Sequence, residues 1–216
     1  MMETPEYIEK LRIIGGDLAL DFVNTEDGDP PEECLRGYGD LVAWSVLVGL
    51  LSDEEGERLT GEADLRPKDA EAAYRDALTL RGALHDVFRA VAEDGAPALR
   101  DLKTLREYER EAMSRGELVQ DGKNFRWEWK DSRDLSGMLW PVAHAAAGLL
   151  TSGSLDRLKL CAGCYWVFLD SSRNRSRRWC TMEVCGTDEK KRRYVAKRRR
   201  ILSDSRRVGN VDSPRT

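Results

Sequence analysis

Four of the five cysteines fall into two close pairs in the C-terminal part of the chain. Two residues separate Cys161 from Cys164, fifteen separate Cys164 from Cys180, and four separate Cys180 from Cys185. Two thiolates from each of two tight turns are a common ligand set for tetrahedral Zn²⁺ in proteins, with Zn–S distances of about 2.3 Å. The spacing therefore predicts one zinc ion bound by Cys161, Cys164, Cys180 and Cys185.

Four sulfur ligands would leave no open coordination position, so the ion is expected to be structural and not catalytic. It would stabilise about fifty residues that are too few to build a hydrophobic core. Gly163 and Gly186 stand at the two turns, where backbone amides can point at sulfur. Two disulfides or four unrelated core cysteines are the alternative interpretations. Cys34 has no neighbouring cysteine, and His85 and His144 lie in expected helices, so these three are interpreted as structural residues.

Basic side chains surround the cysteine pairs. An arginine-rich loop with Ser, Asn and Trp179 separates the pairs, and a basic helix is expected after the second pair. Arginine binds phosphates and guanine, and Ser and Asn also bond phosphate oxygens. The predicted nucleic-acid contacts are Arg173, Arg175, Arg177, Arg178, Arg192, Arg193, Lys197, Arg199 and Arg200. The opposite, apolar stripe of the helix is expected to dock on the finger and comprises Tyr194, Val195, Ile201 and Leu202.

Charge divides the chain into two parts. Residues 157–216 hold 17 basic and 6 acidic residues, a net charge of +11, whereas residues 1–156 hold 18 basic and 33 acidic residues, a net charge of −15. A polyanion would bind the first part and be repelled by the second. A basic segment that only aids solubility is the alternative interpretation.

Hydrophobic periodicity predicts an α-rich (α+β) fold: a helical N-terminal domain with a β-hairpin, followed by a small four-cysteine zinc finger. The predicted divisions are an acidic domain over 1–153, a finger with its basic helix over 154–203, and a flexible tail over 204–216, with a hinge at Ser152–Ser154. Helices are expected over residues 40–51, from Pro67 to Gly95, from Pro97 to about Arg115, and over residues 134–150 with a kink at Pro141. Two further helices are expected to begin at a capping box at Ser52 and at a cap at Thr187. Strands are expected in the hairpin over 117–130 and over 165–169.

Three polar residues stand in apolar surroundings: Asp21 and Asn24 near the N-terminus and Arg81 in an expected helix. A buried Asp21 would need a partner, and Arg81 is the candidate. The functional hypothesis is a small pocket for an anionic effector at these residues. The alternative is that they are exposed or only structural.

Two motifs resemble known families. Gly15–Thr25 resembles the opening signature of the ABATE domain, and Cys161–Arg200, with Trp179–Gly186 ahead of a basic helix, resembles the CGNR zinc finger. The resemblance implies a bacterial, stress-related transcription regulator, with a mainly helical sensing domain and a zinc finger that binds DNA. Thr187 and Asp188 stand where the CGNR motif has Asn and Arg, so an acid replaces a base near the expected DNA-binding surface.

The predicted function is therefore a regulator that binds duplex DNA and whose N-terminal domain senses a small molecule. A zinc-dependent RNA-binding or protein-interaction module is the alternative, because arginine-rich loops with aromatic residues also suit RNA. An enzyme is not expected, since the sequence shows no Ser/His/Asp set and no phosphate-binding loop. The longest apolar run, Leu41–Leu51, is too short to span a bilayer, and the first residues lack a secretion signal. We expect a cytoplasmic protein that joins the bacterial nucleoid when bound to DNA, and a homodimer is compatible with the sequence.

Overall fold

The computed structural model describes residues 4–28, 31–129, 133–152 and 155–208, the last of them with side chains up to residue 199. The α-helices are α1 (Glu6–Glu9), α2 (Leu18–Val23), α3 (Tyr38–Leu47), α4 (Asp53–Leu65), α5 (Pro67–Ala92), α6 (Leu99–Arg115), α7 (Leu139–Thr151) and α8 (Thr187–Val208). A 3₁₀ turn, η1 (Leu155–Arg157), and a π turn, η2 (Met182–Gly186), complete the helical elements. The strands form three antiparallel hairpins: β1 (Glu26–Gly28) with β2 (Pro31–Glu33), β3 (Gly116–Asp121) with β4 (Asn124–Trp129), and β5 (Leu158–Leu160) with β6 (Val167–Leu169). The α-rich fold with small hairpins and a four-cysteine cluster confirms the predicted fold class.

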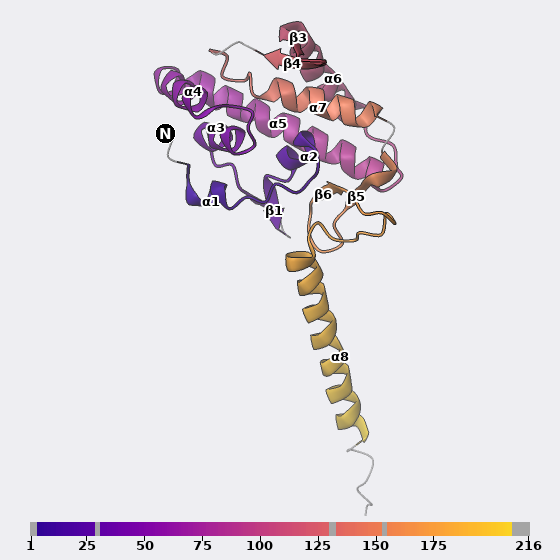
Figure 1. The fold of residues 1–216 in the computed structure, drawn as a ribbon. Helices are drawn as coiled ribbons and strands as arrows, with labels where there is room; N and C mark the ends of the chain where they lie inside the picture. Colours follow the sequence, from indigo (N-terminus) through magenta and orange to yellow (C-terminus); the bar gives the residue numbers. More distant parts are fainter. Residues whose placement is uncertain (1–3, 29–30, 130–132, 153–154, 209–216) are drawn as a thin grey trace, which may run out of the picture.

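The long helix α5 forms the centre of the body (Figure 1). It packs against α2, α3, α6 and α7. Buried residues recur every three or four positions along it, as at Ala73, Ala77, Leu80 and Leu84. α7 is buried along much of its length and contacts α2 and α6 as well as α5. None of the described helices is long and apolar enough to cross a membrane.

Several helix starts follow from local sequence. The capping box at Ser52 is confirmed, because its side chain accepts from the N–H of Glu55 while the Glu55 carboxylate accepts from the N–H of Ser52. Pro67 occupies the first turn of α5, where its missing N–H breaks no helical bond. The predicted start of the helix over 134–150 is wrong: α7 begins at Leu139, so Pro141 also lies in a first turn and not at a mid-helix kink.

The β5–β6 hairpin packs directly on the helical body. Leu158 and Val167 are buried in the same hydrophobic core as Leu20, Leu80 and Phe88. The predicted hinge falls partly on residues 153–154, which lie outside the described residues, and Ser152 ends α7. The division into domains at residue 153 stays a prediction, although the two parts share this core.

The last helix leaves the body (Figure 1). α8 starts at η2, contacts that turn, and extends away from the helical domain. Tyr194 is 66% exposed and Val195 46% exposed, so the prediction that this stripe docks on the finger is wrong for these two residues. The side chains of Ile201 and Leu202 lie outside the described part of the chain. The helix runs to Val208, so residues 204–208, predicted to belong to the tail, are helical.

Candidate metal centre and nucleic-acid interface

The structure brings the four paired cysteines together. The sulfurs of Cys161, Cys164, Cys180 and Cys185 all lie within 4.8 Å of one another. The Sγ–Sγ distance is 3.7 Å from Cys164 to Cys180 and 3.5 Å from Cys180 to Cys185. Four sulfurs placed tetrahedrally at about 2.3 Å from a zinc ion would be about 3.8 Å apart, so the cluster has the size that the ion requires. All four are free thiols, and the disulfide alternative is therefore wrong for this structure.

The electrostatics of the cluster also fit a cation. The hydrogen bond with the Cys161 sulfur is the largest cause that raises the pKa of Cys164. The hydrogen bond with the same sulfur is also the largest cause that raises the pKa of Cys180, to about 12. Thiols this close cannot all lose their protons unless a positive ion offsets the repulsion between thiolates. A Zn²⁺ ion supplies that charge and, with four sulfur ligands, serves a structural role. The four cysteines thus form a structural zinc site.

The backbone around the first cysteine pair is shaped for sulfur. The N–H groups of Gly163 and Cys180 donate to the Cys161 sulfur, with N–S distances of 3.4 Å and 3.3 Å. A Cβ on Gly163 would lie 3.0 Å from the Cβ of Cys185, so a side chain there would push the two ligand turns apart by a few tenths of an ångström. Gly186 differs from the prediction, because its N–H donates to the carbonyl of Thr181 and not to a sulfur.

The second cysteine pair sits at the start of a helix, but the predicted cap is displaced. Thr181 caps η2, where its side chain accepts from the N–H of Val184. Thr187, predicted to cap the last helix, instead donates its hydroxyl to the carbonyl of Met182. The chain needs no second cap at Thr187, because η2 passes directly into α8. The zinc ligand Cys185 therefore lies in the turn from which the basic helix starts.

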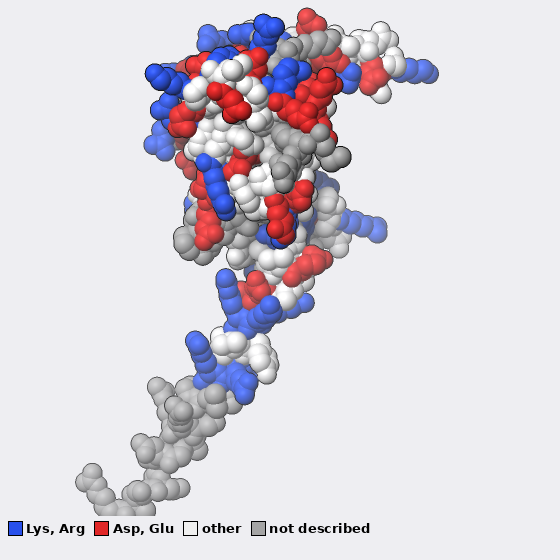
Figure 2. All heavy atoms as spheres, turned by 90° about the vertical axis from the view of Figure 1, so that its left-hand side faces the viewer, with Lys and Arg blue, Asp and Glu red and all other residues white. Residues whose placement is uncertain are grey.

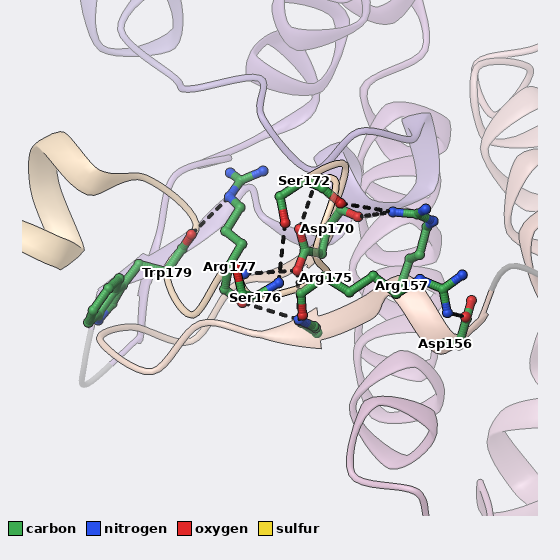
Figure 3. Close-up of polar contacts among 9 residues, drawn as sticks. Asp156, Arg157, Asp170, Ser172, Arg175, Ser176, Arg177 and Trp179 are labelled. Atoms are coloured by element: carbon green, nitrogen blue, oxygen red, sulfur yellow. Dashed lines mark hydrogen bonds and ion pairs between the residues drawn. The ribbon is translucent and has the colours of Figure 1, made fainter.

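A buried carboxylate organises the loop between the cysteine pairs (Figure 3). Asp170 is fully buried, and its carboxylate accepts from the N–H of Ser172 and of Arg177, both at 2.9 Å, and from the Lys159 ammonium at 2.6 Å. Burial alone would raise the pKa of Asp170, but the hydrogen bonds from Lys159, Ser172 and Arg177 outweigh it and hold the pKa well below its ordinary value. Asp170 was not among the predicted site residues, although a charged residue directly after an apolar strand is a usable signal.

The loop arginines differ in their surroundings (Figure 3). Arg177 donates to the carbonyls of Trp179 and Cys180, and its guanidinium lies 4.6 Å from the ring centre of Phe168. Arg175 is exposed and pairs with Asp156. Arg173 and Arg178 are exposed. Arg177 therefore fixes the loop against the zinc site, whereas the other three are exposed, with Arg175 paired to Asp156 and Arg178 over the ring of Trp179.

The basic helix is exposed on all sides over residues 190–199, which include seven lysines and arginines. Figure 2 shows this charge along the helix, next to a body that mixes both signs. Two acids in its first turn pair with basic neighbours, Asp188 with Lys191 at 3.2 Å and Glu189 with Arg193 at 2.7 Å. The predicted contacts Arg192, Lys197 and Arg199 are among the exposed residues. The side chain of Arg200 lies outside the described part of the chain.

Comparison with family models covers nearly the whole chain. Residues 16–153 match the ABATE family, described as a "putative stress-induced transcription regulator", and residues 157–198 match the CGNR zinc finger. The chain belongs to the ABATE family. No curated protein matches it. Both families are described as regulator or zinc-finger types and not as enzymes.

Within the ABATE domain, the predicted Asp21–Arg81 pair is wrong. Arg81 is buried and pairs instead with Glu33, to which it donates two hydrogen bonds, and it also donates to the hydroxyl of Thr25 at 2.9 Å. The Asp21 carboxylate turns back to accept from the N–H of Gly15 at 2.7 Å. Glu33 on β2 lies beside α5 and is the partner of Arg81, whereas Asp21 bonds the backbone of its own segment.

The third residue of that set, Asn24, joins the ABATE domain to the finger. Its side-chain amide donates to the carbonyl of Val167 at 2.9 Å and accepts from the N–H of Val167 at 3.0 Å, and all these groups are buried. The carbonyl of Gly15 accepts from the N–H of Leu169 at 2.8 Å. The Gly15–Thr25 motif therefore holds strand β6 in place. The hypothesis of an anionic effector beside these residues stays a prediction, and they line neither of the two cavities described for this structure.

Aromatic contacts complete this junction. The ring of His85 on α5 stacks on Tyr165, with ring centres 4.0 Å apart and planes 10° apart. Burial is the main cause that lowers the pKa of His85. Trp166 donates to the carbonyl of Glu26 at 2.9 Å, and the Arg12 guanidinium lies over its indole. The interpretation of His85 as a packed structural residue agrees with this position.

Proposed function

We propose that the protein is a DNA-binding transcription regulator in which α8 contacts duplex DNA. The observation that carries the proposal is the exposure of this helix: residues 190–199 carry seven basic side chains and project from the body. The major groove of DNA accommodates an α-helix, and lysine and arginine supply the contacts to phosphates. The helix therefore has the shape and the charge that duplex DNA requires.

The remainder of the molecule positions this helix. The zinc site fixes η2, from which α8 starts, and the ABATE domain holds β6 through Asn24 and Gly15. Residues 1–156 carry a net charge of −15 and would avoid the polyanion. Affinity would come from a local patch, for which we propose Arg173, Arg175, Arg178, Arg192, Arg193, Lys197, Arg199 and Arg200. Arg177, also predicted to contact nucleic acid, supports this patch from within the loop.

We further propose that the ABATE domain senses a small molecule and that the protein acts at the bacterial nucleoid, without enzymatic activity. The description of the family as stress-induced supports an input of this kind. The rigid junction through Asn24 supports transmission from the ABATE domain to the finger, because a change in one packed element displaces the other.

The test is the salt dependence of DNA binding by the full chain loaded with zinc. If about six basic residues neutralise phosphates, log K should fall against log salt with a slope of roughly −5, since each contact contributes about −0.9. Replacing Arg192 and Arg199 by alanine should make the slope shallower by about two units and leave stability within about 0.5 kcal/mol.

Arg106→Ala with Arg110→Ala is the matched control, because it removes two exposed arginines from α6 and should leave the slope unchanged. Structured RNA is measured at the same salt. Tighter binding to RNA than to duplex DNA, or a slope unaffected by the α8 variant, would contradict the proposal.

A further inference from the structure

A hollow of about 580 Å³ opens at the end of the ABATE domain away from the zinc site. The loop between α3 and α4, strand β4 and the start of α7 form its walls. Three indoles, Trp127, Trp129 and Trp140, line it. Its volume falls within the range of about 300–1,000 Å³ that is typical of small-molecule sites. We call it the tryptophan hollow.

The indoles are held in place by their neighbours. Trp129 donates its N–H to the carbonyl of Ala112 at 2.8 Å. The rings of Trp127 and Trp129 have centres 6.4 Å apart and planes inclined by 27°, and the ring of His144 lies against both, at 5.5 Å and 5.6 Å. His144 is in turn 3.0 Å from a carboxylate oxygen of Glu109. Aromatic walls that are fixed before binding reduce the entropy cost of ordering a ligand.

The charges of the hollow favour a cation over an anion. Three carboxylates line it, Glu55, Glu128 and Asp134, against the two guanidiniums of Arg58 and Arg126. Arg126 already bonds Glu128 and lies 4.0 Å from an oxygen of Asp121. The balance among the lining side chains is therefore one negative charge.

The start of α7 offers no backbone donor to an anion. The N–H groups of Leu139 and Trp140 donate to the carbonyls of Ser136 and Gly137, and Pro141 has no N–H. A helix start binds anions through unsatisfied N–H groups, and these first positions supply none. The Arg115 guanidinium, which does not line the hollow, lies 5.5 Å from the centre of the Trp140 ring, so this indole already has one cation beside it.

We propose that the tryptophan hollow binds a flat aromatic cation, which stacks on the indoles and is balanced by the carboxylates. Among the aromatic side chains, tryptophan attracts a cation over its ring face most strongly. The proposal rests on the sensing role proposed above and gives it a site and a class of ligand. α7 begins at this hollow and ends at Thr151, shortly before the finger.

The test is calorimetric titration of the zinc-loaded chain, without DNA, with three ligands of one shape and different charge. N-methylquinolinium is the cation, 4-methylquinoline at about pH 8 the neutral ligand, and 1-naphthoate the anion. We expect the cation to bind at least about tenfold more tightly than either of the others. Equal or tighter binding of 1-naphthoate, or no binding of the cation, would overturn the proposal.

Variants locate the binding. Trp127→Leu should weaken the cation about tenfold, whereas Phe125→Leu, on the same strand but 64% exposed and outside the hollow, should not. Glu55→Gln should weaken the cation about threefold and leave 4-methylquinoline unchanged, since glutamine keeps the capping box but not the charge. Glu55→Gln decides the outcome if Trp127→Leu does not fold, and cation binding that is unchanged in Glu55→Gln overturns the role given to the carboxylates. DNA affinity is measured separately, so that each proposal can fail without the other.

Discussion

The two halves of the zinc finger differ in how they are held. The first half, from β5 to the second cysteine pair, lies against the ABATE domain through the side chain of Asn24, the carbonyl of Gly15 and the stack of His85 on Tyr165. The second half, α8, is exposed over residues 190–199. One family model spans both halves. The residues that pack this small module against the body therefore differ from those that we propose to contact nucleic acid.

The zinc site lies at the boundary between these halves. Three of its sulfurs, from Cys161, Cys180 and Cys185, are buried, and the last belongs to the turn that opens α8. The ion would thus stabilise the packed half and set the direction of the exposed one.

Loss of zinc should have the largest effect, because it affects both halves. Cys180→Ser should abolish stoichiometric zinc binding and unfold the finger, since structural zinc contributes about 10 kcal/mol or more to the folding of small finger domains. The ABATE domain should also melt at a lower temperature, because Val167 and Leu158 belong to its core. Elemental analysis and thermal unfolding measure this. Cys34→Ser, outside the cluster, is the control, and a Cys180→Ser protein with full zinc content would contradict the assignment.

Asn24→Ala should destabilise the packed half and leave the proposed DNA contacts of α8 unchanged. It leaves the N–H and the carbonyl of Val167 without their buried partner, and each unsatisfied group costs about 1–3 kcal/mol. Urea unfolding should therefore show a loss of about 2–6 kcal/mol. Asn174→Ala, in the exposed loop of the finger, should change stability by less than about 0.5 kcal/mol. Equal losses for the two variants would show that the junction contributes nothing.

Acid should destabilise the packed half through Asp170. Its pKa is lowered in the folded protein, so its contribution to stability is full above the unfolded pKa of about 3.9 and is lost as the pH falls below it. The melting temperatures of the wild type and Asp170→Asn should differ at about pH 7, and the difference should start to shrink below about pH 4 and continue to shrink as the pH falls toward the lowered pKa of Asp170. Protonation of the zinc ligands affects both proteins, so the difference between them isolates Asp170. A difference that does not depend on pH would refute this role.

Asp188→Asn should have the smallest effect and act only on the exposed half. It removes the carboxylate that pairs with Lys191 at an exposed site. We expect affinity for non-specific duplex DNA to rise about two- to threefold at low salt, with little change in zinc content or melting temperature. The gain should vanish at about 1 M salt, where the screening length is about 3 Å. Weaker DNA binding by this variant would place the DNA on another face of α8.

Features set by local spacing could be predicted from the sequence. The four zinc ligands, the capping box at Ser52 and the β3–β4 hairpin depend on residues a few positions apart or on a known ligand pattern. Gly163 was also predicted to aid sulfur bonding, and its N–H donates to Cys161. Short-range chemistry decides these features, and the sequence displays it directly.

Features that depend on distant partners could not be predicted. Asn24 and Val167 are 143 residues apart, and Arg81 and Glu33 are 48 apart, so neither pairing leaves a pattern in one sequence. Arg177 looked like its neighbours in the loop, but the carbonyls of Trp179 and Cys180 hold it. The direction of α8 was also missed, because an apolar stripe on a helix does not reveal whether a partner within the chain covers it.

The exposure of α8 has a consequence for how this protein can evolve. A residue in a packed core can change only if its neighbours change with it. Residues 190–199 have no such neighbours within the described chain, so single substitutions there can alter contacts with a target at almost no cost to folding. Single substitutions can therefore change target preference on α8 more readily than they can change the zinc site or the ABATE junction.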